Sequence, residues 1–195
     1  MRKGERTRSR IIQKSSGLFN RHGYLSSSIS DVMKETGLEK GGIYRHFANK
    51  EELVLQAFEY STQVMNKHFQ EVLARECTSI EKLEAVIQIL KGLVEDHPIP
   101  GGCPLMNAAL EADDAYPILA EKTRDSMARL LEMMKQILVT GVEKGEFQKN
   151  MNPEQMAVTW IASLEGGLAL SRLYRDSTYM DIVAAHLLND IASYQ

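Results

Sequence analysis

The chain has 195 residues, of which 44% are hydrophobic and 25% are charged. These values are typical of a globular protein with a sizeable core, and they exclude an intrinsically disordered chain. No window approaches 18 uninterrupted apolar residues, and no apolar segment follows the basic N-terminus. We therefore expect neither a membrane span nor secretion, and we expect a cytoplasmic protein.

The net charge of −3 conceals an uneven distribution along the chain. Residues 1–50 contain 11 Lys and Arg against 4 Asp and Glu, whereas residues 51–195 contain 12 against 22. This asymmetry indicates that only the N-terminal segment meets a polyanion such as DNA. A chance cluster of basic residues at a solvated terminus is the alternative interpretation.

The cysteine and acidic residues do not predict a metal or another cofactor. Cys77 and Cys103 form neither a CxxC pair nor a His/Cys ligand spacing, and they fit a reducing compartment. We interpret Glu111, Asp113 and Asp114 as residues that end one helix and cap the next, rather than as metal ligands.

The hydrophobic pattern is helical almost throughout, which predicts an all-α protein of about nine helices. A first helix is expected over residues 6–22. Ser28, with Asp31 three positions later, forms a capping box that begins the second helix, and Gly37 ends it. A third helix follows over residues 40–47. The fourth, fifth and sixth helices are expected near residues 49–75, 78–95 and 104–112. The seventh is expected from residue 117 to Gly145, and the eighth is expected to begin at Pro153. The ninth is expected to run from Thr178, where Asp181 completes a capping box, to the C-terminus.

Two short helices joined by a glycine-containing turn match a helix-turn-helix, whose second helix enters the DNA major groove. Ile43 and Phe47 lie four residues apart and can anchor the third helix, which leaves Lys40, Tyr44 and Arg45 for its outer face. We therefore expect a helix-turn-helix DNA-binding domain over residues 1–50. Residues 51–195 are expected to form a helical bundle, to which the family resemblance described next assigns ligand binding and dimerisation.

The stretch "SSSISDVMKETGLEKGGIYRHFANKEEL" closely resembles the DNA-binding domain of TetR/AcrR-family repressors. The resemblance covers about residues 6–55, and the expected nine helices agree with that family. It implies that hydroxyl groups and cations hold the phosphate backbone while the third helix faces base edges. The implied DNA-binding residues are Ser27, Ser28, Lys40, Gly41, Gly42, Tyr44, Arg45, His46 and Lys50.

Glu39 departs from the family pattern, which usually has serine at this position. Glutamate is a weaker N-cap, although its charge suits a helix N-terminus. Three interpretations are open: Glu39 reads a cytosine amino group, it repels wrong sequences, or it is a tolerated variant.

The resemblance also implies that the last two helices pair with those of a second copy in a four-helix bundle. The sequence allows this homodimer, because two adjacent glycines permit close helix approach and apolar residues recur in the last helix. The alternative is that these residues fill the monomer core. The candidate interface residues are Gly166, Gly167, Ile182, Val183, His186 and Leu187.

An effector pocket is expected in the helical bundle, where a ligand would shift the protein away from its DNA-binding form. Its composition indicates a largely apolar small molecule, since methionines adapt to irregular ligands. Each candidate is also suited to the core. The candidates are Met65, Phe69, Cys103, Met106, Asn107, Leu110, Met134, Ile137 and Trp160.

Cys103 lies directly before a predicted helix, a position that lowers a thiol pKa. The segment resembles one found in a subset of the family, some of whose members sense electrophiles or oxidants. A thiol-based sensor and a small buried residue are both open. An enzyme with Cys103 as nucleophile and His97 as base is a third, disfavoured hypothesis, because no orienting carboxylate accompanies them.

Taken with these patterns, the resemblance implies a ligand-responsive repressor without enzymatic activity. It would bind a palindromic duplex operator as a homodimer and leave the DNA when a small effector binds.

Overall fold

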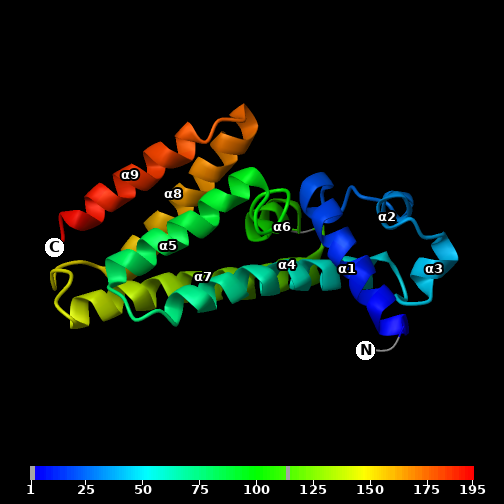
Figure 1. Ribbon diagram of the computed structural model, residues 1–195, viewed down its shortest axis with the longest axis horizontal. Helices are drawn as coiled ribbons and strands as arrows, with labels where there is room; N and C mark the ends of the chain where they lie inside the picture. The colour runs from blue at the N-terminus through cyan, green and yellow to red at the C-terminus, as the bar shows by residue number, and fades with distance from the viewer. Residues whose placement is uncertain (1–2, 113–114) are drawn as a thin grey trace. The chain divides into compact units, whose positions relative to one another are not determined.

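A computed structural model describes residues 3–112 and 115–195 (Figure 1). Within these residues the chain is helical and contains no strand, which confirms the all-α prediction. The elements are α1 Lys3–His22, α2 Ile29–Thr36, α3 Lys40–Tyr44, α4 Lys50–Leu73, α5 Ser79–Gly92, the 3₁₀-helix η1 Leu93–Glu95, α6 Pro104–Ala112, α7 Pro117–Glu143, α8 Pro153–Tyr174 and α9 Thr178–Ala192.

The start and the end of α2 follow the sequence prediction. The Ser28 side chain accepts a hydrogen bond from the Asp31 amide, and the Asp31 carboxylate accepts one from the Ser28 amide, so the capping box is complete. Gly37 ends the helix with φ of 72°. This left-handed conformation is one that glycine adopts without the steric cost of a Cβ.

α3 is shorter than the predicted 40–47 and ends at Tyr44. Two of its five residues are glycines, each of which lowers helix stability by about 1 kcal/mol relative to alanine. Beyond Tyr44 the His46 amide donates to the Ile43 carbonyl over three residues, so a tighter turn replaces the α-helix.

Two other helix ends differ from the prediction. α5 stops at Gly92, and the three residues that follow form η1 before Asp96 turns the chain with a φ of 62°. The predicted cap of α9 by Thr178 and Asp181 is wrong. Ser177 is the N-cap without a side-chain bond, and the Asp176 carboxylate accepts from the Thr178 amide instead. The predicted roles of Asp113 and Asp114 lie outside the described residues.

The chain forms two compact units that differ from the predicted domains of residues 1–50 and 51–195. The first unit joins Met1–Met65 with Ile99–Arg124, so α6 packs with the helix-turn-helix. Its core includes fully buried side chains from α1 to α4: Ile11, Phe19, Val32, Ile43, Phe47, Leu53 and Phe58.

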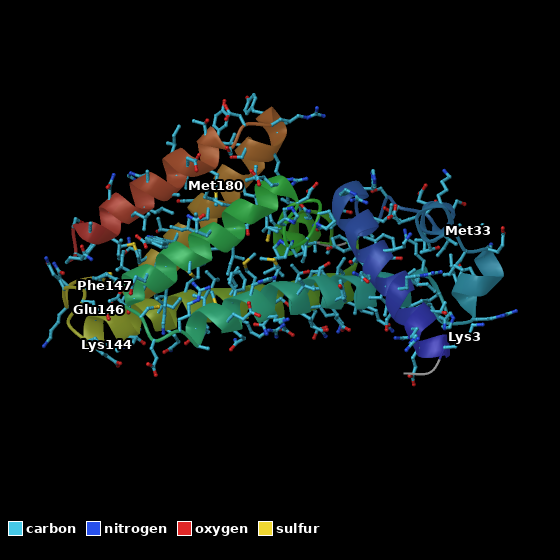
Figure 2. The ribbon with its side chains drawn as sticks, viewed as in Figure 1. Lys3, Met33, Lys144, Glu146, Phe147 and Met180 are labelled. Carbon is cyan, nitrogen blue, oxygen red and sulfur yellow. The ribbon has the colours of Figure 1, made fainter. Side chains whose placement is uncertain are left out.

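The second unit joins Asn66–Pro98 with Asp125–Gln195. α8 and α9 pack along each other, and Met180 of α9, labelled in Figure 2, lies against α8, where a Cβ on Gly167 would come within 3.3 Å of its sulfur. After α7, the Glu146 carboxylate accepts a hydrogen bond of 2.5 Å from the Ser79 amide, which joins the ends of α7 and α5. None of the helices in the described ranges is long and apolar enough to span a bilayer.

Candidate nucleic-acid interface

α3 is held to the first unit by two buried apolar side chains. Ile43 is 0% exposed and Phe47 is 2% exposed, and both belong to the core that α1 and α2 share. The opposite side of α3 therefore faces solvent, where Lys40, Gly41 and Arg45 are all exposed. A short helix anchored on one side and basic on the other is suited to entry into the major groove.

Two cations around α3 lie over aromatic rings. The Lys40 ammonium lies 6.0 Å from the centre of the exposed Tyr44 ring. The Arg8 guanidinium lies 5.0 Å from the centre of the Phe47 ring and donates 3.3 Å to the Glu52 carboxylate. Arg8 therefore joins α1 to α4 beside Phe47, which follows α3, the expected recognition helix. Arg8 is not among the predicted DNA-binding residues, although its position in the basic N-terminal segment is a signal.

The two serines that are predicted to contact phosphate differ in their exposure to solvent. Ser28 is exposed at the start of α2, and its hydroxyl donates 2.7 Å to the Asp31 carboxylate. Ser27 is only 3% exposed, and its hydroxyl donates 2.7 Å to the Gly23 carbonyl. The Ser27 hydroxyl is thus committed within the protein, whereas Ser28 lies at the surface.

The other predicted backbone contacts lie where α3 ends and α4 begins. The Lys50 ammonium donates 2.8 Å to the Leu25 carbonyl, which fixes this cation beside the loop between α1 and α2. His46 is half-buried, with its ring centre 6.5 Å from that of Phe47. Gly42 is half-buried as well, and a Cβ at this position would lie 3.7 Å from the Leu38 side chain.

A pair of asparagines, of which Asn20 is buried and Asn107 half-buried, connects α6 to α1. The Asn107 side-chain nitrogen lies 3.0 Å from the Asn20 carbonyl oxygen, 2.9 Å from Asn20 Oδ1 and 2.9 Å from the Gly101 carbonyl oxygen. The Asn20 side-chain nitrogen in turn donates to the carbonyls of Pro100 and Gly102 at 2.8 and 2.9 Å. We call these two residues the asparagine brace. It was not recognised in the sequence, because nothing in the spacing of residues 87 positions apart predicts the contact.

Gly101 makes this close approach possible. Its φ is 97°, and a Cβ at this position would lie 2.7 Å from backbone atoms of Asn20. A second link lies nearby, where the Leu25 amide donates 3.1 Å to the Glu111 carboxylate. The segment from Pro100 to Glu111 is therefore bonded to the end of α1 and to the loop that leads into α2.

Cys103 and Tyr24 are buried beside the asparagine brace. Cys103 is 4% exposed and Tyr24 is 1% exposed. Burial raises the pKa of Tyr24, and the neighbouring Cys103 and Glu111 raise it further, so this tyrosine remains protonated. Its hydroxyl donates 3.4 Å to Asn20 Oδ1. The thiol is thus enclosed, which disfavours the hypothesis of a nucleophilic enzyme.

The predicted effector residues are divided between the two units. Met65, Cys103, Met106, Asn107 and Leu110 belong to the first unit, and Phe69, Met134, Ile137 and Trp160 belong to the second. Most are buried, but Leu110 is 78% exposed and Asn107 belongs to the asparagine brace. Trp160 is fully buried, and its indole N–H has no hydrogen-bond acceptor among the residues that the structure describes.

The predicted dimer residues also differ in their exposure. Gly167 and Leu187 are buried in the packing of α8 against α9, and Val183 is half-buried beside Gly167. Gly166, Ile182 and His186 are exposed. No cluster of three or more possible metal ligands is found in residues 3–112 and 115–195.

The anchored recognition helix, the capped helix before it and the exposed cations define a helix-turn-helix DNA-binding protein. Residues 11–57 match the family described as bacterial regulatory proteins, tetR family, and residues 79–187 match the tetracyclin repressor-like C-terminal domain. The chain belongs to the TetR family of transcriptional regulators.

Known relatives extend over almost the whole chain. A TetR transcriptional regulator from Chloroflexus aurantiacus J-10-FL is 36% identical, with a TM-score of 0.93 over 100% of this chain and 98% of that one. The HTH-type transcriptional regulator YxaF of Bacillus subtilis is 22% identical over 93% of each chain. The HTH-type transcriptional repressor DhaR of a Mycobacterium species is 22% identical over 89% of this chain and 86% of its own.

Proposed function

We propose that this TetR-family regulator is a repressor that binds a palindromic operator as a homodimer and is released by a small-molecule effector. The observation that carries the proposal is the exposed basic surface of α3, formed by Lys40, Tyr44 and Arg45 above the buried Ile43. Repression is supported by the similarity to DhaR, which is named a repressor. Because a bacterial regulator must reach DNA in the cytoplasm, we infer a cytoplasmic location.

The proposed homodimer is supported by an apolar strip on α8 and α9. Large apolar side chains are exposed at 51% for Val158, 43% for Leu170, 73% for Leu173 and 62% for Ile182. Gly166 lies between them on α8 with no heavy atom within 4 Å of where its Cβ would be. An exposed apolar surface of this kind is suited to a self-complementary contact. A dimer reads a palindrome when its two recognition helices enter major grooves about 34–36 Å apart.

The proposed effector is a largely apolar molecule that carries a hydrogen-bond acceptor. Trp160 supports this chemistry, because a buried donor without an acceptor costs about 1–3 kcal/mol that a ligand carbonyl would recover. Met134 and Ile137, two further candidate effector residues, are also buried in the second unit. Since Trp160 is the one tryptophan of the sequence, its fluorescence would report binding directly.

The experiment is a gel shift of the purified protein with DNA from upstream of its own gene. We expect a discrete complex that contains two chains per palindrome. We also expect some apolar carbonyl compounds from a screened library to dissociate this complex and to change the Trp160 fluorescence. Absence of any sequence-specific complex at low salt would contradict the proposal.

A thiol sensor is the second candidate function, and one observation favours it. Cys103 lies directly before α6, and its carbonyl accepts a hydrogen bond of 3.1 Å from the Asn107 amide beside the asparagine brace. Because the thiol is only 4% exposed, a modifying group would have to displace its neighbours, and this displacement would disturb the contact between α6 and α1. If Cys103→Ser leaves release by electrophiles unchanged in the gel shift, this alternative fails.

A further inference from the structure

Glu39 is an acidic residue directly before α3, the expected recognition helix, and its side chain has no role in the described fold. It is the N-cap residue of α3, yet its carboxylate makes no capping hydrogen bond. It is exposed, and no ion pair joins it to any other described residue. By contrast, the Asp31 carboxylate is bonded to Ser28 and the Glu52 carboxylate to Arg8. The Glu39 side chain is therefore free to contact whatever α3 meets.

We propose that Glu39 determines operator specificity by accepting a hydrogen bond from a cytosine amino group in each half-site. This inference rests on the proposed function. The first residues of a recognition helix contact base edges. Glu39 is exposed directly before α3, which the buried Ile43 and Phe47 hold to the core.

The chemistry of the base edges selects cytosine. In the major groove cytosine presents the N4 amino donor, which a carboxylate accepts, whereas guanine presents the acceptors O6 and N7 and thymine presents the acceptor O4. Adenine presents its N6 donor beside the acceptor N7, which repels a carboxylate. An ionised Glu39 is thus favoured by cytosine and disfavoured by the other three bases.

Because of the surrounding charges, the Glu39 carboxylate increases the sequence selectivity of DNA binding rather than its affinity. DNA phosphates within about 8 Å, the screening length at physiological salt, repel the carboxylate on every sequence. The hydrogen bond offsets this repulsion only where cytosine is present. The neighbouring cations Lys40 and Arg45 supply the attraction that keeps binding favourable overall.

The test is selection of bound duplexes from a randomised pool by the full-length protein and its variants. We expect the wild type to select cytosine at one symmetric position of a palindrome. Glu39→Ser should lose that preference by between about 5-fold and 150-fold without change elsewhere. Glu39→Gln should shift the preference toward adenine, because an amide pairs with the adenine edge. Glu51→Ser, which removes another exposed acid at a helix start, is the matched control and should leave the preference intact.

Two results would overturn the assignment. One is an unchanged sequence preference in Glu39→Ser, with the variant folded as judged by an unaltered thermal midpoint. The other is an equal gain in affinity on all duplexes, which is the behaviour of simple repulsion. A wild type that selects no motif at all would refute the proposed operator binding itself, and the specificity role with it, so the two failures are distinguishable.

Discussion

The Asn107 side-chain nitrogen lies 2.9 Å from Asn20 Oδ1, and this contact joins α6 to the first helix of the DNA-binding unit. Asn20 is 4% exposed and Asn107 is half-buried, so water replaces these hydrogen bonds poorly. Any displacement of α6 must either move α1 with it or break the asparagine brace. The brace therefore connects a helix of the predicted effector region to the helix-turn-helix.

The first prediction concerns the contribution of the asparagine brace to stability. Asn107→Ala removes a donor that serves three oxygens and leaves Asn20 Oδ1 with only the 3.4 Å hydrogen bond from Tyr24, which costs about 1–3 kcal/mol. We expect the free energy of unfolding to fall by that amount in urea denaturation followed by circular dichroism. The exposed Asn150→Ala is the matched control and should change it by less than about 0.5 kcal/mol. Equal stabilities of the two variants would show that the brace contributes nothing.

Sequence patterns predict the structure best where it depends on residues that are close together in the chain. The capping box at Ser28, the glycine stop at Gly37 and the start of α8 at Pro153 are local, and all three are predicted from the sequence. α3 was predicted too long, because the apolar spacing of Ile43 and Phe47 continues through residues that form a turn.

The site was predictable only in part, for a different reason. Exposed cations next to a helix-turn-helix pattern can be recognised, but the inward hydroxyl of Ser27 and the link from Lys50 to Leu25 depend on how the loop folds. The asparagine brace joins residues 87 positions apart and carries no periodic signal. Contacts of this kind follow from tertiary packing, which one sequence does not specify by pattern.

The second prediction is a pH dependence that arises from the capping box of α2. Hydrogen bonds from the Ser28 side chain and amide lower the pKa of Asp31 below its usual 3.8. A carboxyl whose pKa is lower in the folded state stabilises the fold fully above its unfolded pKa, and the contribution is lost as the pH falls through the folded pKa. The stability difference between wild type and Asp31→Asn should therefore be constant near pH 7 and shrink below about pH 4. Thermal midpoints between pH 2.5 and 7 measure it, and a difference that stays constant below pH 4 would contradict the assignment.

The third prediction concerns the salt dependence of DNA binding. If Lys50 contacts a phosphate, Lys50→Ala should weaken binding to all duplexes to a similar extent and reduce the slope of log K against log salt by about 1. Fluorescence anisotropy of a labelled duplex, recorded at salt concentrations from about 50 to about 300 mM, measures this slope. Lys149→Ala removes an exposed lysine outside the DNA-binding unit and should leave the slope unchanged. An unaltered slope in Lys50→Ala would mean that this ammonium serves only its bond to the Leu25 carbonyl.

The fourth prediction tests the proposed homodimer through Leu173, which is 73% exposed on α8. In a two-fold symmetric contact each chain contributes this leucine, and burial of one leucine is worth about 1.5–3 kcal/mol. Leu173→Glu removes both contributions and places carboxylates in the contact, so the dissociation constant should rise by at least about 100-fold. Sedimentation equilibrium should show a wild-type mass of about twice 22.0 kDa and a variant mass near 22.0 kDa at micromolar concentration. Leu110→Glu changes a leucine that is 78% exposed on α6 and should remain dimeric. A monomeric wild type, or a Leu173→Glu variant that dimerises as tightly as the wild type, would show that this part of α8 is not the interface.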